Sequence, residues 1–311
     1  MTGSDLDQRR VGGVSRPAFG LLITTVGVLI LSAEGVLIRL IEVDSWTLLF
    51  LRGVLAAPGL FVFFLVMERR RWWDQLRSMG MAGLLAAVLF GIDNVGFIYS
   101  ITHTSVANTF LLISLSPLFA ALFTRMVLRE TVPRRTWLAI AGGAVATSVI
   151  MLGSVVEGDL PGTLAGLVAA VALGGTLVVL RARPHLNLVP AVALGSALGA
   201  LVGLPASTPS SASPQDWVYL VALGLFLVPV AFGLICTGPR YIPAAEVALL
   251  LLLETVLGAL FVWMAVGEVP SLATVVGGVV LIAVLAAHSV ATLRSLDLAA
   301  GPTHREVHDS G

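Results

Sequence analysis

Apolar residues run through most of the chain in long blocks that short polar breaks separate. Each block is about long enough to cross a hydrocarbon core of ~30 Å as an α-helix rising ~1.5 Å per residue. The ten blocks cover residues 18–40, 46–67, 79–101, 105–128, 136–154, 161–180, 187–206, 217–237, 242–266 and 270–292. The pattern therefore predicts an all-α integral membrane protein with ten transmembrane helices. Residues 1–17 and 293–311 are polar and predict tails at the membrane surface.

The composition agrees with this reading and excludes several classes of protein. Of the 311 residues, 57% are hydrophobic and 12% are charged, whereas a soluble domain carries roughly 25% charged residues. The net charge is zero, and no basic block is long enough to indicate nucleic-acid binding. Cys236 is the single cysteine, which excludes intrachain disulfides and cysteine-based metal sites. We expect no cofactor and no metal.

The arginines indicate the orientation of the helices. All 18 basic residues are arginine, and cytoplasmic connections are expected to hold the excess of positive charge. With the N-terminus in the cytoplasm, alternation of the ten blocks places on the inner side Arg9, Arg10, Arg16, Arg69, Arg70, Arg71, Arg77, Arg125, Arg129, Arg134, Arg135, Arg181, Arg183, Arg240, Arg294 and Arg305. Only Arg39 falls at the outer edge, and Arg52 lies inside a block. We therefore predict that both termini are cytoplasmic.

An internal repeat divides the chain into two halves. The segment 103–130 aligns without gaps onto 241–268 at a constant offset of 138 residues. The aligned pairs include Ala107 with Ala245, Leu111 with Leu249, Leu115 with Leu253, Phe123 with Phe261 and Glu130 with Glu268. Residues 18–154 and 155–292 are thus predicted as two repeats of five helices. Because five is odd, the second repeat is inverted in the membrane, which is characteristic of secondary transporters.

A signature in the fourth block resembles a known family. The stretch from Leu115 to Ala121 (LSPLFAA), running on to Leu128-Arg129-Glu130, resembles the signature of the EamA-type family of the drug/metabolite transporter superfamily. The pair Gly142-Gly143 and the positions of Arg39 and Arg52 resemble it as well. In the second half Leu253-Glu254-Thr255 stands where the family often has Leu-Glu-Pro. Thr255 departs from that pattern and weakens the expectation of a proline-induced helix break.

The resemblance covers essentially the whole chain and implies a function. Members of the family export amino acids, metabolites and drugs, so the implied partners are a small-molecule substrate and the lipid bilayer of a bacterial plasma membrane. The implied architecture is a central cavity lined by the first four helices of each repeat. The fifth and tenth helices are implied to be peripheral or to lie at a dimer contact, so the chain is expected to be a monomer or a homodimer.

Four polar residues are predicted to lie at one depth in the membrane. A charge at mid-bilayer costs roughly 2.5–3.5 kcal/mol on insertion scales, so such residues usually face an interior cavity. Glu34, Arg52 and the pair Asp93-Asn94 come from three consecutive blocks and fall about 9–12 Å below the outer surface at ~1.5 Å per residue. We expect a substrate site, a proton site or both. The alternative is a structural ion pair that fixes helix packing.

A second polar group follows from the repeat. Glu246 and Glu254 are eight residues apart, so their directions differ by about 80° and they share one side of the ninth helix. Asn108 and Ser116 are their equivalents on the fourth helix. Matching polar positions on two related helices suggest a cavity at the interface between the repeats. Glu254 falls near the midplane with no base expected at its depth, which makes it a candidate for the coupling proton. The alternatives are a neutral, hydrogen-bonded acid at Glu254 and an interfacial structural role for Glu246.

Prolines mark points where helices can kink or begin. Pro117, Pro229 and Pro243 are predicted as kinks that serve as gating hinges, or as simple helix starts. The sequence thus favours a secondary active exporter of a small polar or zwitterionic metabolite, such as an amino acid, with protons as the coupling ion to test. The alternative is a passive facilitator or channel. A membrane-embedded enzyme is disfavoured, because no HExxH, Ser/His/Asp or paired-acid arrangement is present.

Overall fold

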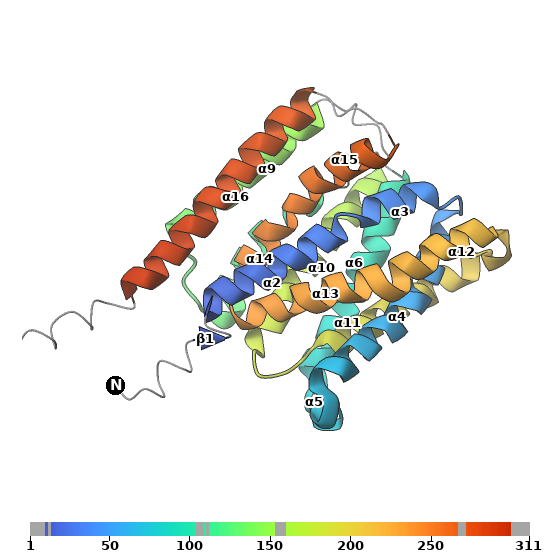
Figure 1. The fold of residues 1–311 in the computed structure, drawn as a ribbon, viewed down its shortest axis with the longest axis horizontal. Coiled ribbons are helices and arrows are strands. Elements are labelled where there is room, and N and C mark those ends of the chain that lie inside the picture. Colours follow the sequence, from blue (N-terminus) through green and yellow to red (C-terminus); the bar gives the residue numbers. More distant parts are fainter. Residues whose placement is uncertain are drawn as a thin grey trace, which may run out of the picture.

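The computed structural model describes residues 10–11, 14–103, 109, 112–152, 160–266 and 272–299. In these ranges the chain is a bundle of helices preceded by a short antiparallel strand pair (Figure 1). The elements up to residue 152 are β1 (Arg10–Val11), β2 (Val14–Ser15), α2 (Arg16–Leu31), α3 (Glu34–Leu40), α4 (Ser45–Glu68), η1 (Arg69–Arg71), α5 (Trp72–Ser78), α6 (Gly80–His103), α8 (Ser116–Phe123), η2 (Thr124–Leu128) and α9 (Arg134–Leu152).

The second half continues the same architecture. Its elements are α10 (Leu160–Ala182), α11 (Val189–Gly203), η3 (Leu204–Ala206), η4 (Pro209–Ser211), α12 (Pro214–Val221), η5 (Ala222–Leu227), α13 (Val228–Thr237), η6 (Gly238–Arg240), α14 (Ala244–Leu251), α15 (Leu253–Val266) and α16 (Leu272–Ala299). The segments η2 and η5 are π-helical, a local widening that is frequent at functional sites. The all-α prediction is therefore confirmed.

Seven helical stretches in the described part of the chain are long and apolar enough to cross a membrane. They are Arg16–Leu40, Ser45–Glu68, Gly80–Ser100, Leu160–Ala182, Val189–Ala206, Pro214–Arg240 and Ala244–Ala265. Two shorter apolar helices, Ser116–Leu128 and Val275–His288, lie inside two further blocks of the sequence. Helix α9 occupies the remaining block. The total of ten transmembrane helices and their orientations stay predictions.

Two of the long stretches are interrupted. Between α2 and α3 the chain turns at Ser32-Ala33, and the Ser32 hydroxyl donates to the Val28 carbonyl at 2.8 Å, a back-bond that bends helices. Between α14 and α15 the interruption is Leu252, whose N–H donates to the Leu249 carbonyl at 3.1 Å. The helix is therefore interrupted although Thr255 stands in place of the family's proline, because the tightened turn at Leu252 is enough to break the regular helix. Each interruption places an acid, Glu34 or Glu254, in the first turn of the next helix.

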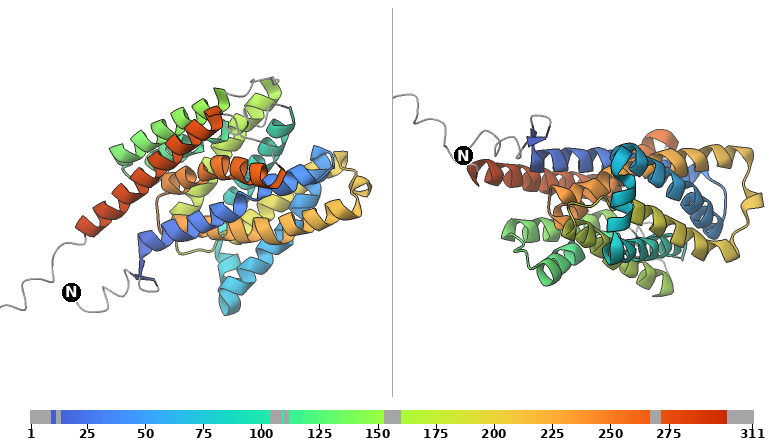
Figure 2. Two further views of the ribbon diagram at one scale, coloured as in Figure 1. Left: turned by 45° about the horizontal axis from the view of Figure 1, so that its top comes forward. Right: turned by 90° about the horizontal axis from the view of Figure 1, so that it is seen from below.

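Helix pairs in the two halves correspond to one another. In the predicted repeat, α2 corresponds to α10 and α6 corresponds to α13, so the packing of α2 on α13 matches the packing of α6 on α10. The other three main pairs each join two corresponding helices: α4 with α11, α8 with α14 and α9 with α16. Figures 1 and 2 show α9 and α16 side by side along one edge of the molecule. Glycines permit the closest crossings: a Cβ on Gly53 of α4 would lie 2.6 Å from the Ser196 carbonyl of α11. The bundle therefore packs backbone against backbone, as small residues allow in membranes.

Polar contacts tie the two halves together at one end of the α4–α11 pair. Asp44 caps α4 by accepting from the backbone N–H groups of Trp46 and Thr47, both at 3.0 Å. It also accepts from the hydroxyls of Thr47 and Thr208, and Thr208 N–H donates to Thr47 Oγ1 at 2.7 Å. Partial burial raises the pKa of Asp44, but the hydrogen bonds from Thr47, Thr208 and Trp46 outweigh it, so the pKa lies below its usual value. An ionised Asp44 therefore holds the 207–213 connection against the start of α4.

A corresponding tie is present at the other end of the same pair. Asn187 precedes α11 and accepts from Val189 N–H at 3.2 Å. Its own N–H donates to Gln75 Oε1 at 3.0 Å, and its side-chain amide donates to Glu68 Oε1 at 2.9 Å. The start of α11 is thus bound to the end of α4 and to α5. Hydrogen bonds therefore join the two halves at both ends of the α4–α11 pair, at Asp44 before α4 and at Asn187 before α11.

Two of the three candidate hinge prolines lie at helix starts. Pro117 is in the first turn of α8 and Pro243 is the residue before α14, where proline fits because the first N–H groups of a helix have no partner within it. Pro229 lies inside the continuous stretch Pro214–Arg240, directly after the π-helical η5. A gating role for the three prolines stays a prediction.

Candidate functional site

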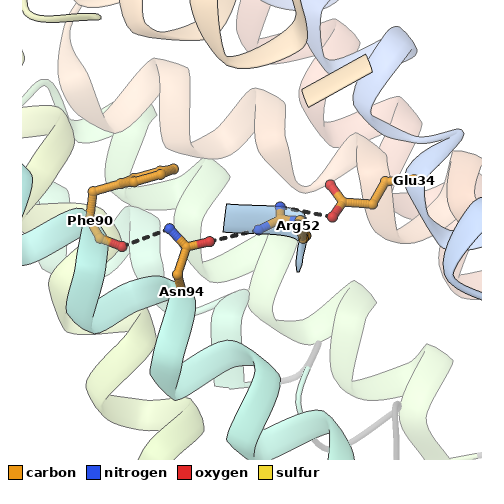
Figure 3. A network of polar contacts seen from close by, with 4 residues as sticks. All are labelled: Glu34, Arg52, Phe90 and Asn94. Atoms are coloured by element: carbon orange, nitrogen blue, oxygen red, sulfur yellow. Dashed lines mark hydrogen bonds and ion pairs between the residues drawn. The ribbon is translucent and has the colours of Figure 1, made fainter. Parts of the chain in front are cut away.

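A buried polar network joins α3, α4 and α6 (Figure 3). The Arg52 guanidinium lies 2.8 Å (Nη2 to Oε1) from Glu34 and donates from Nη1 to Asn94 Oδ1 at 2.7 Å. The Asn94 side chain donates in turn to the Phe90 carbonyl at 3.0 Å. Three interactions in series, from carboxylate through guanidinium and amide to a backbone carbonyl, thus cross the interior of the bundle.

The network is shielded from solvent. Glu34, Arg52 and Asn94 expose 6%, 7% and 7% of their surface, and neighbouring Asp93 exposes 9%. In such surroundings an ion pair is retained only with good geometry and further hydrogen bonds, and losing one partner leaves an uncompensated buried charge. Both terminal nitrogens of Arg52 are engaged, one by each neighbour. The spacing in the sequence predicts one depth in the membrane for these residues. The structure shows that the side chains of Glu34, Arg52 and Asn94 also point toward one another.

Asp93 and Asn94 differ in their contacts with Arg52. They are consecutive residues on α6 and therefore point about 100° apart, so only one of them directly faces the guanidinium, and it is Asn94. Asp93 is buried within electrostatic range of both Arg52 and Glu34. The Asp93 carboxyl thus belongs to the same charged group through electrostatic interaction over a longer range.

Glu254 of the second half lies close to this group. Helix α15 packs against α3, so the charges of Glu34, Arg52 and Asp93 act on the Glu254 carboxyl. We call Glu34, Arg52, Asp93, Asn94 and Glu254 the central cluster. It draws on three helices of the first half and one of the second.

The charges of the central cluster do not balance. The cluster holds three carboxyl groups and one guanidinium, which leaves two negative charges in excess if all are ionised. A low-dielectric site resists such an excess and relieves it by taking up protons or a cationic group. The site also borders the π-helical η5, because a Cβ on Gly224 would lie 3.3 Å from the Arg52 carbonyl. The cluster therefore combines an excess of acidic groups with a position beside a π-helical segment.

The structure separates Glu246 from Glu254. Glu246 is buried in the first turn of α14 and its Oε1 lies 3.8 Å from His288 Nε2 on α16. His288 lies near the end of the tenth block, a position that favours the membrane interface; its surface is 7% exposed, and α16 continues past it to Ala299. No motif or spacing in the sequence pointed to this contact. Ser116 is buried at the start of α8, and Asn108 lies outside the described residues.

Known proteins resemble this chain over most of its length. The sequence model of the EamA-like transporter family matches it twice, over residues 18–152 and 160–289. The chain is 27% identical to a protein of Pseudomonas aeruginosa described as "Pseudopaline exporter CntI", over 73% of this chain and 81% of that one. It is 26% identical to the uncharacterized transporter YetK of Bacillus subtilis, over 49% and 50% of the two chains. A solved crystal structure with 21% identity shares the fold, with a TM-score of 0.74 over 88% of this chain and 97% of the other.

Proposed function

The chain belongs to the EamA-like transporter family, and from this premise we propose that it is a secondary active exporter of a small zwitterionic or polar metabolite. Transport by alternating access requires a site that both sides of the membrane reach in turn. The central cluster is the observation that carries this proposal, since it places four ionisable groups from both halves in the interior of the bundle. An amino acid or a related compound suits a site that offers carboxylates and a guanidinium.

The proposed architecture is ten helices in two inverted repeats, 18–154 and 155–292. Two observations support it: the family model matches once in each half, and the helix pairs with the most extensive packing have counterparts when the halves are exchanged. In inverted repeats the exchange of conformations between halves converts an inward-open state to an outward-open one. In this proposal the polar ties at the two ends of the α4–α11 pair close the substrate path at the two sides of the membrane.

The relatives support export from a bacterial cell. One of them is described as an exporter of pseudopaline, and export requires a location in the bacterial plasma membrane. The coupling ion in the proposal is the proton, held by Glu254 or Asp93 in the central cluster. The peripheral α9–α16 pair is the surface that a homodimer would use. A passive facilitator is the competing reading, and it differs from the carrier in its kinetics.

Flux measurements on reconstituted protein test the proposal. Proteoliposomes are loaded with radiolabelled leucine, lysine or glutamate, and efflux is followed with and without an imposed pH gradient. We expect efflux of at least one zwitterionic probe to saturate, to accelerate when unlabelled compound is present on the other side, and to run against a concentration gradient when the pH gradient is applied. Non-saturating efflux without counterflow would identify a passive facilitator instead.

Single-cysteine labelling tests the orientation. In a Cys236→Ser background, Ser211→Cys in η4 and Ser78→Cys in α5 place exposed thiols at opposite ends of the α4–α11 pair. A membrane-impermeant maleimide is expected to label position 211 on intact cells and position 78 only after permeabilisation, because arginines concentrate beside position 78. Labelling with the reverse order would overturn the orientation. The same orientation places Glu157, Asp159 and Asp216 on the outer side; the first two lie outside the described residues, and Asp216 lies in the first turn of α12.

A further inference from the structure

The connection between α4 and α6 carries an exposed basic surface. Arg69, Arg71 and Arg77 are exposed, and Arg70 lies between the first two in the sequence. The only acid on this connection is Asp74, and Glu68 just before it is bound to Asn187. Helix α5 projects from the bundle at this point (Figure 1). The connection therefore presents an excess of positive charge directly beyond the end of a membrane-crossing helix.

Two tryptophans lie within the same connection. Trp73 is 47% exposed, and the guanidinium of Arg77 lies 4.8 Å from its ring centroid. Trp72 contacts Trp73 edge to face at 5.2 Å and packs inward against the hydrophobic core. Tryptophan rings favour the boundary between hydrocarbon and headgroups. The Trp72 ring thus anchors α5 to the bundle, whereas the Trp73 ring holds Arg77 at the level where lipid headgroups are expected.

The equivalent connection in the second half has none of these features. It links α11 to α12 through η3 and η4, and residues 204–213 are Pro, Ser, Thr, Ala and Leu without a charge. The two connections join corresponding helices, so connection geometry alone does not require arginines. In the proposed inverted arrangement they lie at opposite faces of the membrane, so the basic and aromatic residues belong to the face at α5, where anionic headgroups would meet them.

We propose that Arg69, Arg71 and Arg77, with the exposed ring of Trp73, form a binding surface for the headgroups of anionic phospholipids. A phosphate that lies beside α5 meets two or more guanidinium groups, which bind phosphate through paired hydrogen bonds. The glycerol backbone of the lipid then lies at the level of Trp73. Bound lipid fixes α5, and through Gln75 it supports the tie to Asn187 at this end of the α4–α11 pair. The partner is a lipid of the surrounding membrane, not a soluble phosphate.

Native mass spectrometry of the full-length protein tests this surface without any transport assay, so its outcome is independent of the proposed function. The purified protein is titrated with phosphatidylglycerol or phosphatidylcholine in detergent, and retained lipid is counted. We expect selective retention of phosphatidylglycerol and an at least ~10-fold weaker affinity in Arg69→Gln/Arg71→Gln/Arg77→Gln, because each arginine near an anionic surface contributes roughly fivefold.

A matched variant controls for total charge. Arg125→Gln/Arg129→Gln/Arg134→Gln removes the same charge from three other exposed arginines, and each triple contains one residue with positive φ, Arg69 or Arg129. This control is expected to retain phosphatidylglycerol as the unmodified protein does. Equal losses in both triples, or retention unaffected by the α5 triple while the protein stays monodisperse, would overturn the proposal. Trp73→Leu is expected to lower retention with the arginines intact.

Discussion

Neutralising either Arg52 or Glu34 alone is expected to eliminate transport and to lower the yield of folded protein. Each single change, Arg52→Gln or Glu34→Gln, leaves the partner as a buried charge without its counter-ion. The cost of such a change is about 3–5 kcal/mol, which is a large fraction of the stability of most proteins. The measurements are the folded fraction by size-exclusion chromatography and the rate of flux in proteoliposomes.

The double variant Glu34→Gln/Arg52→Gln separates structure from function. It removes both charges and leaves two neutral amide groups in their place, which can donate and accept hydrogen bonds within the network. We expect folding to recover towards that of the unmodified protein while transport stays absent, since the site then lacks its guanidinium and one carboxylate. Recovery of near-normal flux together with folding would show that the pair is purely structural and would remove the central cluster as a substrate site.

The second large effect is expected at Glu254. If this carboxyl carries the coupling proton, Glu254→Gln abolishes the response to an imposed pH gradient, because a glutamine side chain cannot bind and release a proton in this range. Exchange of labelled for unlabelled substrate continues, since exchange needs no net proton movement. The measurement is accumulation against a gradient in parallel with counterflow, both in proteoliposomes.

Glu246→Gln is the matched control for this experiment. It makes the same substitution on the same interrupted pair of helices, but beside His288 on α16 and not in the central cluster. We expect this variant to keep its response to the pH gradient. A Glu254→Gln protein that still responds fully would assign Glu254 a structural role, and Asp93→Asn would then be the next variant to measure.

The sequence by itself determined the class of the protein and the positions of its helices. Burial in lipid imposes a cost on every polar group, so the chain must carry long apolar blocks, and these are visible without any knowledge of packing. The described helices lie within or close to the predicted blocks. The family followed from a contiguous signature for the same reason, since local residues carry it. The list of candidate residues could also be read directly, because few ionisable residues occur inside the blocks.

Which of these residues meet was decided by the tertiary structure alone. The depth of a residue along its helix follows from counting residues. The direction of its side chain around the helix axis changes by about 100° per residue, and this direction selects a partner only once the neighbouring helices are in place. The sequence therefore placed Asp93 and Asn94 at the level of Arg52 and left open that the amide would be the direct partner. Likewise, the sequence paired Glu254 with Glu246 on one helix. Packing of α15 against α3 brought Glu254 to the central cluster, and a contact within the second half brought Glu246 to His288, because packing between segments distant in the chain selects the neighbours of each side chain.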